Sequence, residues 1–195
     1  KTRDGKDHGV LSAHGEQTLA ADKRAFVQMM TYLRDHDPQN TVILVQPENE
    51  TGSYGNPRDY SATGNRLFAQ AVPAALARQT GRSGTWAQVY GAQADRAFNT
   101  WYVASYVNAI AAAGKAAKPL PMYVNASLSG PSNVPDPEGV ASGGPQQDVL
   151  DIWKAAAPAI DFAAPDIYDR TSANVVAYLD KYARPDNALM VPEIG

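Results

Sequence analysis

Four short runs of apolar residues recur along the chain, separated by longer segments in which apolar residues have helical spacing. The runs cover residues 41–46, 120–125, 160–166 and 188–193 and are rich in valine, isoleucine, methionine and aromatic residues. Apolar runs of this length are typical of strands that are covered on both faces. We therefore predict four strands, and we expect them to pair in parallel because a helix precedes each of them.

The first predicted helix covers residues 18–35 and places Leu19, Phe26, Met29, Met30 and Leu33 on one face. It must end before Pro38, because the residue preceding a proline is excluded from the helical conformation.

A second helix is predicted after Thr85, which forms a capping box with Gln88, and it is expected to run to Gly114. A third helix is expected near Pro145, and a fourth is expected to begin at Ser172.

The resulting order of helices and strands predicts an α/β protein with the (β/α)8 TIM-barrel fold. Four strand–helix steps are too few for a barrel, which usually takes about 250 residues. We therefore expect residues 1–195 to be part of a single catalytic barrel domain that contributes about strands 4 to 7. The long segments 51–84 and 127–144 follow strands and are predicted to be loops of the functional rim, because the opposite connections are short.

Composition limits the classes of function. The chain has 195 residues, 44% of them hydrophobic and 19% charged, which is typical of a globular domain. A net charge of −3 argues against a nucleic-acid partner, and no apolar run approaches the length that crosses a membrane. The absence of cysteine excludes disulfides and thiolate chemistry.

Two glutamates stand where predicted strands end. Glu50 closes the segment that follows the first run, and Glu193 closes the last run. The carboxyl ends of barrel strands form the catalytic rim, and glycoside hydrolysis uses two carboxyl groups on either side of the scissile bond. Ordinary solvated charges at strand ends are the alternative interpretation of both residues.

Residues 42–50, with the sequence Val-Ile-Leu-Val-Gln-Pro-Glu-Asn-Glu, closely resemble the fourth barrel strand of glycoside hydrolase family 35, a family of β-galactosidases. The resemblance implies that Glu50 is the acid/base and that Asn49 binds a sugar hydroxyl. Glycoside hydrolase family 35 belongs to the clan A barrels, and residues 190–195 resemble the seventh strand of that clan. This resemblance implies that Glu193 is the nucleophile.

Two further runs extend the resemblance. Residues 120–126 are similar to the fifth strand, and residues 164–168 are similar to the sixth, whose end often carries a tyrosine that touches the nucleophile. Each candidate substrate-binding residue also has a structural alternative, such as packing or a backbone hydrogen bond. These candidates are Glu48, Asn49, Tyr54, Asn125, Asp166 and Tyr168.

The resemblance implies an exo-acting β-galactosidase that retains anomeric configuration and needs neither cofactor nor metal. Its partner would be a carbohydrate, and the usual location of family members favours the periplasm or the outside of the cell. Retention predicts carboxyl groups about 5–5.5 Å apart, whereas inversion requires roughly 6.5–9.5 Å. Three alternatives remain open: another retaining glycosidase of the clan, such as an arabinosidase or glucosidase, a non-catalytic carbohydrate-binding barrel, and a non-glycosidic protein with a doubly wound sheet.

Overall fold

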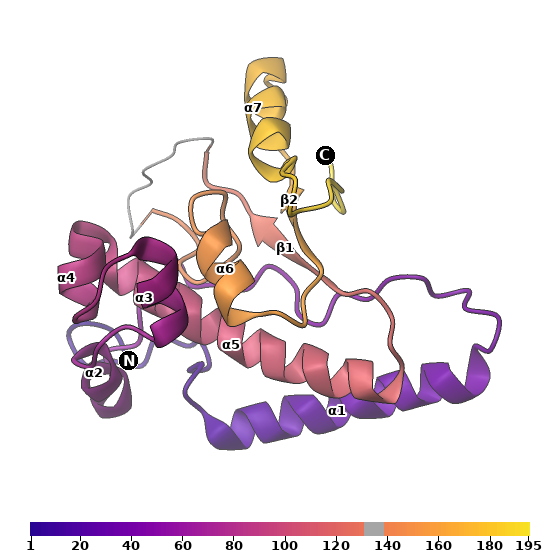
Figure 1. Ribbon diagram of the computed structural model, residues 1–195, viewed down its shortest axis with the longest axis horizontal. Coiled ribbons are helices and arrows are strands. Elements are labelled where there is room, and N and C mark those ends of the chain that lie inside the picture. The colour runs from indigo at the N-terminus through magenta and orange to yellow at the C-terminus, as the bar shows by residue number, and fades with distance from the viewer. Residues whose placement is uncertain (131–138) are drawn as a thin grey trace.

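The computed structural model describes residues 1–130 and 139–195 and shows helices packed around a small parallel sheet (Figure 1). Long helices α1 and α5 lie side by side, α2, α3 and α4 gather at one end of α5, and α7 projects beyond the sheet. The elements are α1 (Glu16–His36), α2 (Ala62–Phe68), α3 (Ala74–Thr80), α4 (Trp86–Tyr90), η1 (Gly91–Gln93), α5 (Ala94–Ala117), β1 (Tyr123–Ser127), α6 (Leu150–Ala156), β2 (Phe162–Asp166) and α7 (Ser172–Tyr182).

The prediction of a TIM barrel is wrong. In the described part of the chain the sheet has two strands, β1 and β2, which pair in parallel with Tyr123 opposite Phe162 and Ser127 opposite Asp166. The chain is a small mixed α/β domain in which helices outnumber strands. Parallel pairing of the two strands was predicted correctly, but residues 1–130 and 139–195 contain two strands rather than four.

The outer runs, 41–46 and 188–193, do not form strands. Val45 makes one isolated parallel bridge to Met122. The last run contacts the chain just after β2 through the carbonyl of Glu193, which accepts the N–H of Ile167 at 2.9 Å, next to an isolated bridge between Ile167 and Ile194. Their side chains are not covered on both faces, since Ile43 is 74% exposed. Without burial on both faces, an apolar run lacks the packing that stabilises a strand.

The helix predictions agree with the structure better than the strand predictions do. Helix α1 buries Phe26 and Met30 of the predicted apolar face, but Met29 is 42% exposed, so its assignment to that face is wrong. The capping box of Thr85 and Gln88 is present at the start of α4. The predicted continuous helix is interrupted at Gly91, where φ is +56°, and α5 then continues beyond Gly114.

The third and fourth predicted helices are displaced or differently capped. Helix α6 begins at Leu150 rather than near Pro145, and Ser172 is the first residue of α7, whose cap residue is Thr171.

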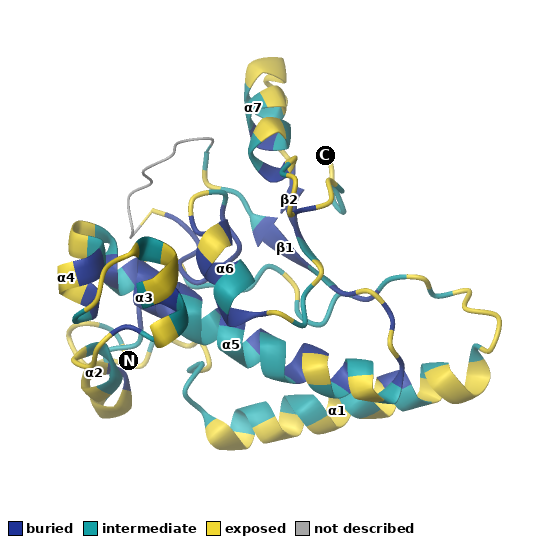
Figure 2. Ribbon diagram, in the orientation of Figure 1, coloured by how far each residue is buried: buried dark blue, intermediate teal, exposed yellow. Residues whose placement is uncertain are grey.

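Two hydrophobic clusters form the core (Figure 2). The larger surrounds α5 and includes Trp86, Phe98 and Trp153, whereas the smaller joins α1 to α5 and to the residues just before β1 through Met30 and Met122. No helix in residues 1–130 or 139–195 is long and apolar enough to cross a membrane.

The two predicted rim loops pack against each other. Segment 51–84 contains the short helices α2 and α3, and Ser53 exchanges two backbone hydrogen bonds of 2.9 Å with Ser142 of segment 127–144. A Cβ atom on Gly144 would lie 2.4 Å from the carbonyl oxygen of Thr51, so the close approach requires glycine. Residues 131–138 of the second loop lie outside the described residues.

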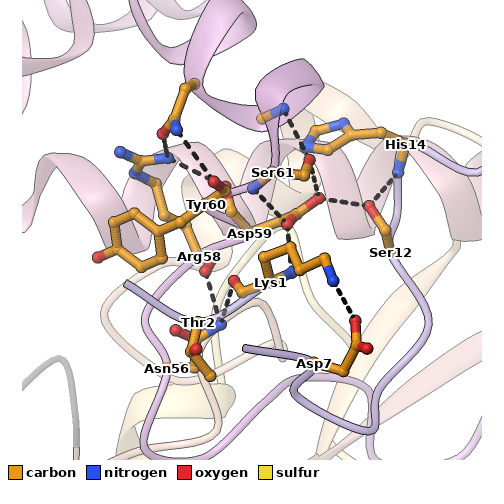
Figure 3. A network of polar contacts seen from close by, with 12 residues as sticks. Lys1, Thr2, Asp7, Ser12, His14, Asn56, Arg58, Asp59, Tyr60 and Ser61 are labelled. Atoms are coloured by element: carbon orange, nitrogen blue, oxygen red, sulfur yellow. Dashed lines mark hydrogen bonds and ion pairs between the residues drawn. The ribbon is translucent and has the colours of Figure 1, made fainter. Parts of the chain in front are cut away.

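A polar network anchors the first loop to the body of the molecule (Figure 3). Arg58 is 7% exposed, lies 4.0 Å from the ring centroid of Tyr60 and donates to Asp95 at 2.7 Å. Asp59 accepts hydrogen bonds from Ser12 and Ser61, at 2.7 and 2.8 Å. These contacts hold in place the loop that follows Glu50.

The contact between α1 and α5 is sensitive to side-chain volume at Gly114. A Cβ atom there would lie 2.2 Å from Phe26 and 3.1 Å from Met30. We expect Gly114→Ala to lower the free energy of unfolding by about 1–3 kcal/mol, because an overpacked interface must shift. Urea unfolding measures this change, with the exposed substitution Ala112→Ser in α5 as the control. An unchanged midpoint for Gly114→Ala would contradict the packing described here.

Candidate functional site

Three carboxyl groups meet at the edge of the sheet where β1 and β2 end. One oxygen from each of Glu50, Asp166 and Glu193 lies within 4.8 Å of the others. Asp166 is the last residue of β2, Glu50 closes the segment that follows the first outer run, and Glu193 ends the other outer run. We call these three residues the carboxyl cluster. It forms because parallel strands, and segments that follow them, deliver their carboxyl ends to one edge.

Asn125 is the hub of the carboxyl cluster. Its side chain is buried, and its Oδ1 accepts the backbone N–H of Glu50 at 2.8 Å. Its Nδ2 lies within hydrogen-bond distance of Asp166 Oδ2 at 2.7 Å, Asn49 Oδ1 at 3.0 Å and Glu193 Oε1 at 3.3 Å. The NH2 group has two hydrogens for these three acceptors, so it cannot donate a full hydrogen bond to all of them at once.

The backbone of Glu50 is in an unusual conformation. Its φ is +43°, in the left-handed region that residues with a side chain rarely adopt. Such a conformation costs of the order of 1–3 kcal/mol and persists where surrounding contacts impose it, often at functional sites. The hydrogen bond from Glu50 N–H to Asn125 is one of those contacts.

Tyr168 holds the other side of Glu193. Its hydroxyl donates to Glu193 Oε2 at 2.7 Å, and this hydrogen bond is the main reason that the pKa of Tyr168 is raised. The Tyr168 side chain is 60% exposed, so it borders solvent as well as the cluster. With Asn125 on one oxygen and Tyr168 on the other, the Glu193 carboxylate is fixed in orientation.

Asp166 is the most buried member of the cluster, with 2% of the residue exposed. Burial raises the pKa of Asp166 to about 7, and the charges of Glu193 and Glu50 act in the same direction, while the hydrogen bond from Asn125 opposes them. The cluster therefore tends to retain a proton near neutral pH.

Glu48 and Tyr54 lie outside the carboxyl cluster. Glu48 and Asp22 line a different pocket. The pKa of Glu48 is raised, mainly by burial and to a lesser extent by the negative charge of Asp22. Tyr54 is 52% exposed, and its hydroxyl pairs with Ser127 Oγ at 2.6 Å. Asn49 is closer to the cluster, since its Oδ1 accepts from both Gln46 and Asn125.

A pocket of about 320 Å³ opens beside the cluster, bordered by Glu50, Asp166 and Tyr168. It is completed by Asn174 and Tyr178 of α7, which the sequence analysis did not identify. Their spacing of four residues on one helix, just after the end of β2, is the signal that could have identified them.

A second pocket, of about 360 Å³, lies on the other side of Glu50 and includes Glu48, Asp22 and Tyr106. Glu50 thus borders both pockets.

The spacing of the three carboxylates is one that a cation can bridge, but donors already face them. The Asn125 amide donates to Asp166, and the Tyr168 hydroxyl donates to Glu193. Hydrogen-bond donors directed at carboxylates compete with a metal ion for the same lone pairs. Asp166 Oδ1 has no such donor among the described residues, so the set can hold a shared proton, sugar hydroxyls or a cation.

No protein-family model matches the chain, and no curated protein matches it. Support for a function therefore comes from the residues themselves and from their arrangement, and the likeness to glycoside hydrolase family 35 stays an expectation.

Proposed function

We propose that this protein is a retaining glycoside hydrolase, with β-galactosidase activity as the expected specificity. The observation that carries the proposal is the approach of Glu50 and Glu193, which have carboxyl oxygens within 4.8 Å of each other. Retaining enzymes hold their two carboxyl groups about 5–5.5 Å apart, and inverting enzymes about 6.5–9.5 Å apart. An approach of this kind is compatible with the shorter separation of a retaining pair, because an inverting pair must leave room for a water molecule beside the sugar.

The first step transfers the sugar to the protein. Glu193 attacks the anomeric carbon and forms an ester, while the bond to the leaving oxygen breaks and Glu50 gives that oxygen its proton. Tyr168 and Asn125 hold one oxygen each of Glu193, so the attacking carboxylate is already oriented. Orientation of this kind lowers the entropic cost of reaching the transition state.

The second step releases the sugar. Glu50, now a carboxylate, takes a proton from water, and the oxygen of that water attacks the anomeric carbon and displaces Glu193. Two inversions give net retention, and both glutamates return to their starting protonation states.

The sizes of the pockets favour an exo-acting enzyme. The pocket beside Asp166 and Tyr168 measures about 320 Å³, near the lower end of the range of about 300–1,000 Å³ for ligand sites. It is small enough for a single sugar, and we assign the leaving group to the second pocket because Glu50, the proposed acid, borders both. Galactose is the expected sugar because of the family resemblance, in which Asn49 binds a hydroxyl.

Proton NMR of the reaction with an aryl β-galactoside tests this proposal. We expect β-galactose to be the first product, followed by slow mutarotation to the α anomer. Aryl arabinosides and glucosides, supplied in parallel, determine the sugar. First appearance of the α anomer would contradict retention, and the absence of hydrolysis across the panel would overturn the enzyme proposal and leave a carbohydrate-binding role.

A further inference from the structure

The third carboxyl group of the cluster has no part in the two steps above. Asp166 is 2% exposed, and its Oδ2 accepts from Asn125 at 2.7 Å. Its Oδ1 is buried and has no hydrogen-bond donor among the described residues. A buried carboxylate oxygen without a donor is costly, so its environment needs either a cation or a proton.

The groups that face Asp166 supply no positive charge. Glu50 approaches from the segment after the first run, Glu193 from the C-terminal run, and Asn125 from β1. Tyr123 of β1, Tyr168 after β2 and Tyr182 of α7 also interact with it electrostatically. Asp169 lines the same pocket and adds a further carboxyl group. In the described part of the chain, no lysine, arginine or histidine borders the pocket beside Asp166.

We propose that Asp166 is a positioning residue that shares one proton with Glu50 and so keeps the acid/base supplied with that proton at neutral pH. The role in catalysis rests on the proposed hydrolase function. Two carboxyl groups form a hydrogen bond only when one of them carries a proton. Glu50 and Asp166 bring carboxyl oxygens within 4.8 Å of each other, so a shared proton can join them.

The charge of the cluster stays constant through the reaction under this arrangement. In the free protein, Glu193 is one negative charge, and Glu50 with Asp166 and the shared proton is a second. After the first step Glu193 is a neutral ester, while Glu50 and Asp166 are both ionised, because the proton has left with the leaving group. Water then returns the proton, and the cluster never carries three negative charges, which three adjacent carboxyl groups resist.

The direction of the pH dependence follows from the burial of Asp166 and from its like-charged neighbours. These raise its pKa to about 7, so the cluster holds the shared proton below that pH and loses it above. Because the two groups are coupled, the titration belongs to the pair rather than to either residue. Activity is therefore expected to fall as the pH rises through neutrality.

The test is the pH profile of kcat/KM for Asp166→Asn with an aryl β-galactoside. The amide keeps the shape of the side chain and removes its charge, so we expect the alkaline limb to move to lower pH by about one unit. Asp180→Asn, an exposed substitution on α7, should leave the limb in place. An unmoved limb would overturn the proposal, whether KM rises, as for a substrate ligand, or only stability falls, as for a structural residue.

A second measurement needs no turnover and no variant that must fold. In carbon NMR of the wild-type protein labelled at aspartate carboxyl groups, we expect one buried resonance to titrate near pH 7. Titration of every aspartate in the ordinary acidic range would overturn the shared proton, even in an active hydrolase. A shift of the buried resonance with added Mg²⁺ or Ca²⁺ would also overturn it, since a cation would then occupy the cluster. If the NMR result holds and no glycoside is cleaved, the hydrolase proposal fails by itself.

Discussion

Replacement of Glu193 by glutamine is expected to lower kcat for aryl β-galactosides by about four orders of magnitude or more. An amide cannot attack the anomeric carbon to form the ester, so the covalent route is lost. Glutamine has nearly the same shape, but its single carbonyl oxygen can accept from only one of Tyr168 and Asn125, because these two donate to different oxygens of Glu193. Steady-state kinetics, together with an unfolding curve, separates loss of chemistry from loss of fold.

Two further variants make the Glu193 prediction specific. Glu16→Gln makes the same chemical change at an exposed position of α1 and should retain wild-type turnover. Glu193→Gly leaves space for a small anion, so added azide should restore cleavage and give an α-galactosyl azide. Wild-type turnover in Glu193→Gln would contradict the assignment of the nucleophile.

Replacement of Glu50 by glutamine is expected to lower kcat about 10²–10⁴-fold for substrates whose leaving group needs a proton. A dinitrophenyl leaving group departs without protonation, so the first step should be nearly unimpaired for that substrate. The second step still lacks its base, and the glycosyl ester should accumulate. Rates for a series of aryl galactosides measure the contrast between good and poor leaving groups.

The leaving-group dependence is the part of the Glu50 prediction that a structural role would not reproduce. If Glu50 only supported the backbone at its left-handed φ, glutamine would affect all substrates equally. An equal loss for dinitrophenyl and alkyl galactosides would therefore contradict general acid catalysis by Glu50.

The helices could be predicted from sequence because their signals are local. The apolar face of α1 and the capping box at Thr85 depend on neighbours within a few residues, and both are present. The outer strands could not be predicted in the same way. An apolar run at residues 41–46 indicates burial, but whether Ile43 is covered depends on distant parts of the molecule, and it is 74% exposed.

The meeting of Glu50 with Glu193 followed from placing both at the same edge of a parallel sheet, and it does not require a barrel. Asn125 and Tyr168 were identified as candidates, but their hydrogen bonds to Glu193 depend on three-dimensional contacts. The raised pKa of Asp166 could not be predicted from the sequence, because it depends on burial and on two carboxyl groups that come from distant parts of the chain.

Mass spectrometry of the protein after reaction with a fluorinated galactoside tests the central claim most directly. The fluorine slows both the formation and the hydrolysis of the glycosyl ester, and a good leaving group restores the rate of formation. The ester therefore persists long enough for the labelled protein to be digested and the modified peptide to be sequenced. We predict one sugar per chain, attached to Glu193. A sugar on Glu50 or Asp166, or steady hydrolysis with no trapped ester, would contradict the proposed nucleophile.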